Sequence, residues 1–473
     1  MKNIFVFCLI LFQTFSLAQE KQFTTADELS YLLKDPFFSR CQISIDAYNI
    51  SQKEIIFRHN EKLLFHPASN MKLITTSTAL LFLGPEYNFT TQVKYDGEIN
   101  DGVLNGNLYF VGGFDPDFTS EDLDTLISKI KEEGINKING NLYTDISNMD
   151  SLEWGLGWMW DDDPSLDFPH LTPLPINKTV VKVAIEPSFI GQKAKLKLIP
   201  ESNYFKFVNN IVTVDNDTTD LLISRDWIND SDSLIFEGGL FFEAEPDTVN
   251  INIKNTNQYF LHLAKETLLK NEIAFNGKCG IKIIPENSLP IASKHRLYKN
   301  VIINLNKDSD NLGAEMSLRA LAFDKYGKYA SAQKGIELID SLITEVGLNP
   351  EDYRLVDGSG VSHYNLVSSE LLNEILIYMH QYHPELFQIL YHSFPIAGVD
   401  GTLKSRMKAG KAFNNVHAKT GTLSGVSSLS GYLKAKNGDL ISFSINTQNY
   451  IGSARKAQNF QDKICEILSN MEE

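Results

Sequence analysis

The hydrophobic pattern near the N-terminus predicts a strand hairpin followed by a buried helix. Residues 43–48 and 54–57 have strand character and flank a polar stretch, as in a β-hairpin. Residues 70–83 are apolar enough for a helix in the centre of a fold, and a Gly-Pro pair ends it. The sequence therefore predicts that Ser69 lies at the start of a central helix.

The pattern changes between residues 88 and 294, where many short strand-like runs are separated by Gly, Asn and Asp. Within this part, residues 180–198 and 211–237 alternate between apolar and polar positions, which favours a further small all-β unit. After residue 297 the chain is mixed again. The elements expected there are a strand at 301–305, helices at 313–323 and 369–380, strands at 426–434 and 440–446, and a short amphipathic helix after residue 456.

A single α/β domain split by a long insertion accounts for this order of patterns. The predicted divisions are residues 19–87 with 295–473 for the α/β domain, residues 88–165 with 246–294 for the inserted domain, and residues 166–245 for a small all-β domain nested in the insertion. A chain of 473 residues is long enough for two or three such cores.

Composition and charge narrow the possible functions. Hydrophobic residues make up 43% and charged residues 22%, which is the balance of a globular protein. The formal net charge is -16, and a field of that sign repels polyphosphate, so we expect no nucleic-acid partner.

The first residues predict export. A basic start, a short apolar run and small residues before the predicted cleavage site, Ala18, indicate a signal peptide at residues 1–18 and a periplasmic location. The run is too short for a transmembrane anchor. The remaining cysteines, Cys41, Cys279 and Cys465, are too few and too widely spaced for a disulfide scaffold or a zinc site, so we expect free thiols, no metal and no cofactor.

Ser69 and Lys72 form the first candidate catalytic motif. A serine hydroxyl needs a base within hydrogen-bond reach, and residues three apart on a helix share one face. Burial beside another cation such as Lys419 would lower the pKa of Lys72 towards neutrality. The same S-x-x-K spacing occurs four more times, but only Ser69 opens an apolar helix and precedes two further motifs in the required order.

Two further motifs supply the remaining groups of a serine peptidase. In Ser309-Asp310-Asn311, the hydroxyl can relay a proton to a leaving amine and the Asn311 amide can orient a substrate backbone. In the segment 419–422, an ammonium and a hydroxyl can hold a substrate carboxylate, and a glycine permits close approach of a ligand. The predicted substrate-binding residues are Asn311, Lys419, Thr420, Gly421 and Thr422, and the predicted catalytic residues are Ser69, Lys72 and Ser309.

The three motifs in this order form the set of penicillin-binding proteins and class A β-lactamases. The chain resembles, more narrowly, the D-alanyl-D-alanine carboxypeptidase/endopeptidase family of low-molecular-mass class C penicillin-binding proteins. The further stretches that carry the resemblance are Pro67-Ala68-Ser69 and residues 112–116, 157–162, 357–360 and 397–403. Phe114 stands where that family usually has glycine, and His363 where arginine is expected.

The resemblance implies a serine β-lactamase/transpeptidase-like domain, an antiparallel sheet with flanking helices, interrupted by two nested β-rich domains. It implies a serine-type carboxypeptidase or endopeptidase acting on peptidoglycan stem peptides, with β-lactams as covalent inhibitors, and backbone N–H groups of Ser69 and Thr422 as the oxyanion hole. A β-lactamase and a non-catalytic cell-wall scaffold stay open as alternatives, as does self-association. A Ser-His-Asp hydrolase is disfavoured because no G-x-S-x-G motif occurs.

Overall fold

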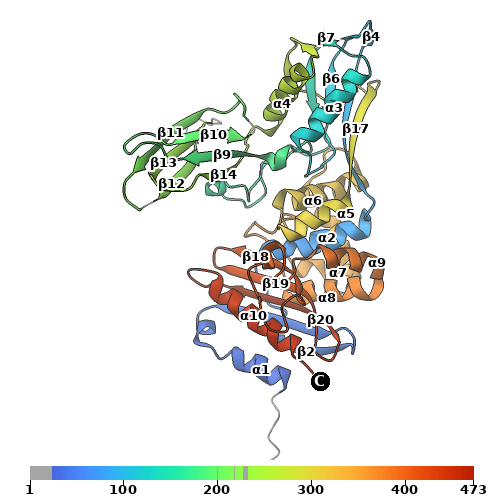
Figure 1. The fold of residues 1–473 in the computed structure, drawn as a ribbon. Coiled ribbons are helices and arrows are strands. Elements are labelled where there is room, and N and C mark those ends of the chain that lie inside the picture. Colours follow the sequence, from blue (N-terminus) through green and yellow to red (C-terminus); the bar gives the residue numbers. More distant parts are fainter. Residues whose placement is uncertain (1–23, 200, 218, 227–232, 473) are drawn as a thin grey trace, which may run out of the picture.

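The computed structural model of the chain describes residues 24–199, 201–217, 219–226 and 233–472. The predicted signal peptide, residues 1–18, lies outside these ranges. Figure 1 shows a mixed helix and sheet region that contains both ends of the described chain, and an inserted region that extends away from it. Within the described residues, no helix combines the length and apolar character that crossing a membrane requires.

A five-stranded antiparallel sheet forms the centre of the α/β region, in the order β18-β19-β20-β1-β2. Its strands are β1 (Gln42–Asn49), β2 (Glu54–His59), β18 (His417–Leu423), β19 (Val426–Lys434) and β20 (Leu440–Gln448). Alternate residues of β1 face opposite sides of the sheet. Ile43, Ile45 and Ala47 join one apolar cluster, whereas Ser44 and Asp46 contact Ser369 and Asn373 on the other side.

Helices cover both faces of this sheet. On one face lie α1 (Thr25–Leu32) and α10 (Arg455–Ser469), whose Leu29, Ile464 and Leu468 are fully buried against the strands. The helices of the other layer are α2 (Met71–Phe82), α5 (Tyr298–Lys307), α6 (Asn311–Tyr326), α7 (Ala332–Glu345), α8 (Ser369–Tyr382) and α9 (Pro384–Ser393). Because α2 is buried from Met71 to Leu80, it forms the centre of this layer. Each Leu or Ile so buried contributes about 1.5–3 kcal/mol.

Most elements predicted for this region are confirmed. The hairpin, the central helix, the helices at 313–323 and 369–380 and the two C-terminal strands all form at those positions. The strand predicted at 301–305 is wrong, because these residues belong to α5. The short β-branched run favours a strand when it is taken alone. Over a longer window the apolar residues have helical spacing, and one buried face of α5 contains Tyr298, Val301, Ile302 and Leu305.

The insertion begins after α2 and is built on two sheets and two helices. One sheet has the order β16-β8-β6-β3-β17 and the other β15-β7-β5-β4. Their strands are β3 (Asn88–Tyr95), β4 (Glu98–Asn100), β5 (Val103–Asn105), β6 (Leu108–Val111), β7 (Lys137–Ile138), β8 (Leu142–Asp145), β15 (Ala274–Phe275), β16 (Cys279–Ile281) and β17 (Leu289–Leu297). The helices α3 (Ser120–Glu132) and α4 (Thr256–Lys270), which the β-rich interpretation missed, complete this core.

Six further strands form two small three-stranded sheets, β10-β9-β14 and β11-β13-β12. They are β9 (Val180–Glu186), β10 (Lys195–Ile199), β11 (Phe207–Val214), β12 (Asp220–Arg225), β13 (Leu234–Phe241) and β14 (Asp247–Asn252). We propose the predicted division into nested domains with one adjustment. Because β14 pairs with β9, the small unit extends past residue 245 to the end of β14.

The insertion leaves and re-enters the α/β region at one place. Strands β3 and β17 pair along their length, with Asn88 opposite Leu297. Directly beyond this pair, the backbone N–H of Tyr298 donates to the carbonyl of Tyr87 at 2.9 Å. Two adjacent strands therefore join the inserted region to the helices beneath it (Figure 1).

Candidate active site

Ser69 lies in the short 3-10 helix η2 (Ala68–Asn70), which runs directly into α2. Ala68 has φ 46°, a left-handed conformation that is unusual for a residue with a side chain. A Cβ atom added to Gly421 of β18 would lie 2.8 Å from the backbone nitrogen of Ser69. Glycine at this position therefore allows β18 to pack directly against the turn that carries the serine.

Lys72 is fully buried one turn after Ser69. Its Nζ donates to Ser69 Oγ at 2.9 Å, to Asn311 Oδ1 at 2.5 Å and to the carbonyl of Ser359 at 2.8 Å. Burial lowers the pKa of Lys72 to about 8, although nearby carboxylates, with Asp357 foremost, act in the opposite direction. Lys72 can therefore lose a proton near neutral pH while it stays within hydrogen-bond distance of the serine.

Lys419 and Ser309 form a second hydrogen-bonded pair. Lys419 Nζ donates to Ser309 Oγ at 2.9 Å and to the carbonyl of Thr420 at 2.8 Å. Burial, together with the nearby Lys72 ammonium, holds the pKa of Lys419 well below its usual value. Ser309 has a left-handed backbone, with φ 60°. Asn311, two residues later, is the first residue of α6, and its Nδ2 donates to the carbonyl of Asp167 at 2.5 Å.

A cavity of about 280 Å³ lies between these groups. The predicted residues that line it are Ser69, Ser309, Asn311, Thr420 and Thr422. The remaining three do not line it. Lys72 and Lys419 are fully buried and hydrogen-bond the lining serines, and Gly421 packs against η2. Its wall also includes Asp167 and Phe168 of the insertion, and Thr402, whose hydroxyl hydrogen-bonds that of Thr420 at 2.7 Å.

Two buried carboxylates that the sequence analysis did not select hold the loop beside Lys72. Glu315 Oε1 accepts from the backbone N–H groups of Gly358 and Ser359, both at 2.9 Å. Asp357 accepts from the Gly360 and Ser362 N–H groups and from Trp158 Nε1. Residues 357–360 carry part of the family resemblance, and Asp357 among them is buried and does not line the cavity. Both acids fix the Ser359 carbonyl that accepts from Lys72.

A lysine of the insertion, Lys178, contacts the motif Ser309-Asp310-Asn311. Lys178 forms ion pairs with Asp117 and with Asp310, whose Oδ2 lies 2.6 Å from its Nζ. It belongs to the short helix η4 (Asn177–Thr179), whose three residues all have positive φ. Burial alone would lower the pKa of Lys178, but the two carboxylates raise it above its usual value. Nothing in the spacing of the sequence indicates this contact.

Within the described residues, no group of three or more His, Cys, Asp or Glu side chains is arranged to hold a metal ion. The site combines two lysine-serine pairs, whose serines line the cavity, with the Asn311 amide and two threonines. Such a site suits acyl transfer to a serine.

The sheet with helices on both faces and the serine-lysine site define the serine β-lactamase/transpeptidase-like class, as the sequence analysis predicted. The crystal structure of penicillin binding protein 4 (dacB) from Haemophilus influenzae superposes with a TM-score of 0.85 at 28% identity, over 94% of this chain and 99% of that one. The same protein complexed with a novel β-lactam matches with a TM-score of 0.78 at 26% identity, over 93% of this chain and 98% of that one.

Comparison with whole sequences assigns the family within this class. The chain belongs to the D-Ala-D-Ala carboxypeptidase 3 (S13) family, whose profile matches residues 25–471. It is 30% identical to the D-alanyl-D-alanine carboxypeptidase DacB of Haemophilus influenzae over 84% of this chain and 83% of the relative. It is 28% identical to a D-alanyl-D-alanine carboxypeptidase of Actinomadura sp. over 94% of this chain and 84% of the relative. The predicted family is confirmed.

Proposed function

We propose that the chain is a serine-type D-Ala-D-Ala carboxypeptidase or endopeptidase that acts on peptidoglycan stem peptides through an acyl-serine intermediate. Membership of the S13 family and the activity for which both relatives are named support this reaction. The observation that carries the mechanism is the 2.9 Å contact between Lys72 Nζ and Ser69 Oγ, made by a buried amine with a lowered pKa.

In the first step the neutral Lys72 amine takes the proton of Ser69 Oγ as the oxygen attacks the carbonyl carbon of the penultimate D-alanine. The new C–O bond moves negative charge onto the carbonyl oxygen. Backbone N–H groups of Ser69 and Thr422 receive this charge, because both residues line the cavity where the carbonyl would lie.

In the second step the tetrahedral intermediate breaks its C–N bond. The leaving nitrogen needs a proton, and the proton that Lys72 took from Ser69 reaches it through Ser309, whose hydroxyl lies in the cavity and accepts from the Lys419 ammonium. Lys72 is neutral again after this transfer. D-Alanine, or the amine of a cross-linked peptide, then departs. Water attacks the acyl-serine, with Lys72 again as base, and regenerates the serine.

The carboxylate of the terminal D-alanine would lie against β18. Thr420 and Thr422 expose hydroxyl groups to the cavity, and the Lys419 ammonium behind them supplies positive charge. Asn311, which accepts from Lys72 through Oδ1 and donates through Nδ2, is held to orient the peptide backbone. β-Lactams would enter the same site and acylate Ser69.

We also propose that the protein is exported to the periplasm after cleavage near Ala18. The basic and apolar first residues support this location, as does a substrate that lies in the cell wall. N-terminal sequencing of the protein recovered from a periplasmic fraction tests it, and an intact Met1 there would contradict cleavage.

Intact-mass spectrometry after brief exposure to benzylpenicillin tests the mechanism. A long-lived adduct that peptide mapping assigns to Ser69, and its absence from Ser69→Ala, is the expected result. Rapid loss of penicillin without a persistent adduct would favour a β-lactamase, and no reaction would favour a non-catalytic scaffold. Retained D-alanine release by Ser69→Ala would contradict the assignment of the nucleophile.

A further inference from the structure

A second, larger cavity lies where the inserted sheet meets the helices below it. Its volume is about 530 Å³, and its walls come from β3, from the loops after β6 and β8, from the 284–288 loop and from the C-terminal end of α6. Asn311 begins α6 at the active site, and Asp324, near the end of α6, lines this cavity. At about 1.5 Å per residue, the helix separates the two places by about 20 Å.

Two lysines of this cavity have no partner. Lys94 of β3 and Lys328, which follows α6, both line it, and no hydrogen bond or ion pair joins either ammonium to another residue in the described part of the chain. Neighbouring lysines differ in this respect. Lys294 is paired with Asp122 at 2.5 Å and Lys299 with Glu86 at 2.7 Å. The cavity therefore presents two available cations.

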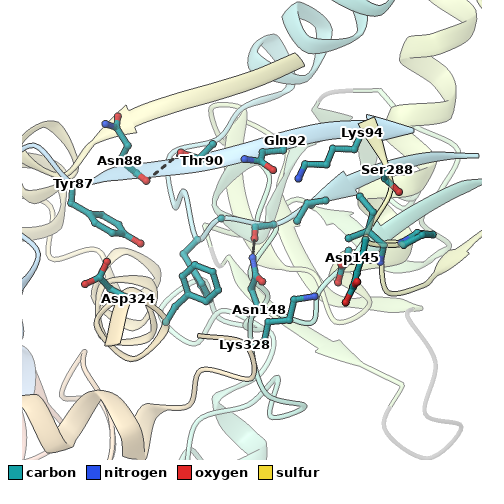
Figure 2. A pocket seen from close by; sticks show the side chains of 18 residues that line it. Tyr87, Asn88, Thr90, Gln92, Lys94, Asp145, Asn148, Ser288, Asp324 and Lys328 are labelled. Atoms are coloured by element: carbon teal, nitrogen blue, oxygen red, sulfur yellow. Dashed lines mark hydrogen bonds between the residues drawn. The ribbon is translucent and has the colours of Figure 1, made fainter. Parts of the chain in front are cut away.

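Three carboxylates, Asp145, Glu286 and Asp324, line the cavity. Figure 2 shows Tyr87 and Asp324 together at one end, Lys94 and Asp145 at the other, and Lys328 between the two ends. The Asp145 carboxylate already accepts from the backbone N–H groups of Ser147 and Ile284. It is therefore less available to a ligand, whereas the Asp324 carboxylate is exposed. Glu286 of the 284–288 loop is exposed as well, and no ion pair in the described part of the chain joins it to Lys94 or Lys328. One end consequently suits a carboxylate and the other an ammonium group.

The wall between the two ends is rigid and partly aromatic. Phe114 has φ 65°, is fully buried and lies 5.6 Å from the ring of Phe323. Gly112 and Gly113 before it allow backbone contacts that a Cβ would block at 2.5 Å and 2.0 Å. Asn148 is fixed by its bond to the Gly112 carbonyl at 2.7 Å (Figure 2). A strained backbone kept beside a cavity is typical of binding sites.

From this distribution of charge we propose that the cavity binds a peptide bearing a free carboxylate and a free amine, the carboxylate at Lys94 and Lys328 and the amine at Asp324 and Tyr87. The inference rests on the proposed function, since peptidoglycan stem peptides have this chemistry. The 20 Å separation corresponds to about six extended residues. A stem peptide bound here would belong to the same polymer as the one being cleaved, at a distance from the scissile bond.

The test uses the full chain with its active site already acylated by benzylpenicillin, so that binding there is blocked. The probe is a stem tripeptide without D-alanine, with free carboxylates and a free side-chain amine, titrated by calorimetry. We expect the Lys94→Gln/Lys328→Gln double variant to bind at least tenfold more weakly than the unchanged chain. Lys129→Gln, an exposed lysine of α3 outside the cavity, is the matched control and should bind normally.

Hydrolysis of a short acetylated D-Ala-D-Ala peptide separates this inference from the proposed function. All three proteins should hydrolyse it with equal kcat/KM, while release of D-alanine from intact peptidoglycan falls only in the double variant. Equal binding by the double variant, or unchanged binding when the probe's carboxylates are amidated, would overturn the inference. A chain that neither hydrolyses the short peptide nor reacts with penicillin refutes the proposed function instead, and the tripeptide titration is then made on the unreacted chain.

Discussion

The buried position of Lys72 predicts a steep pH dependence of serine acylation. With a pKa of about 8, caused mainly by burial, the fraction of neutral amine is about 1% at pH 6, about 10% at pH 7 and about 50% at pH 8. Only the neutral amine can accept the serine proton. We therefore expect the second-order rate constant of acylation to rise about tenfold from pH 6 to pH 7, about fivefold from pH 7 to pH 8, and to level off above pH 9.

The assay is stopped-flow acylation by a fluorescent penicillin between pH 6 and pH 9.5. More acidic buffers are avoided because burial raises the pKa of Asp357, and protonation of Asp357 would alter the charge beside Lys72. Lys72→Met, which keeps the length of the side chain but has no amine, should reduce the rate constant by about 10²–10⁴ and remove the pH dependence. Its Tm, compared with that of the unchanged chain, shows whether it folds.

Two results would refute the reasoning. A rate constant that is flat between pH 6 and pH 7 would mean that Lys72 is already neutral or is not the base. A folded Lys72→Met variant that is acylated within tenfold of the normal rate would exclude the amine from the reaction. Either result would make Lys419 and Ser309, the other lysine-serine pair at the cavity, the next candidates for the base.

Three further predictions concern stability and geometry. Burial lowers the pKa of His417 to about 4, so the unfolded chain binds more protons than the folded chain between pH 4 and pH 6.5. We therefore expect this histidine to lower the free energy of unfolding by about 2 kcal/mol as the pH falls through that range. Urea unfolding of His417→Phe should show a smaller fall. Lys178→Met should lower the free energy of unfolding by about 1–3 kcal/mol, because Asp117 and Asp310 lose their cation. Lys197→Met removes an exposed ion pair and should change the free energy of unfolding by less than about 0.5 kcal/mol. Gly421→Ala should slow penicillin acylation more than tenfold, since its Cβ would lie 2.8 Å from the Ser69 nitrogen; normal acylation would contradict this packing argument.

Local patterns were enough to predict the elements on which the first and third motifs lie. The apolar run after Ser69 could only be a buried helix, and the strands at the C-terminus alternate around a turn. Helix α5 was missed because Val301 and Ile302 favour strands when taken alone. Helix α3 had clear signals, with a capping box between Thr119 and Asp122 and apolar residues at 123, 126, 127 and 130, but the surrounding glycines and asparagines drew the interpretation towards strands.

The candidate site was predictable as far as its chemistry depends on short motifs. The contacts of Lys178 with Asp310 and of Glu315 with the 358–359 backbone join segments that are distant in sequence. Neither spacing nor composition encodes such contacts, because they arise only when the insertion packs against α6. The positive φ at Phe114 also has no local signal, and a left-handed conformation of this kind is one that glycine adopts more readily than phenylalanine.

The pairing of β3 with β17 has a consequence for how the chain folds. The two halves of the α/β region are separated by about 200 residues, and closing a flexible loop of that length costs about 5 kcal/mol of chain entropy. An insertion that folds first brings residues 88 and 297 together and so reduces the loop to the two strands themselves. The inserted region therefore lowers the entropy cost of joining the N-terminal hairpin and helix to the C-terminal strands that complete the central sheet.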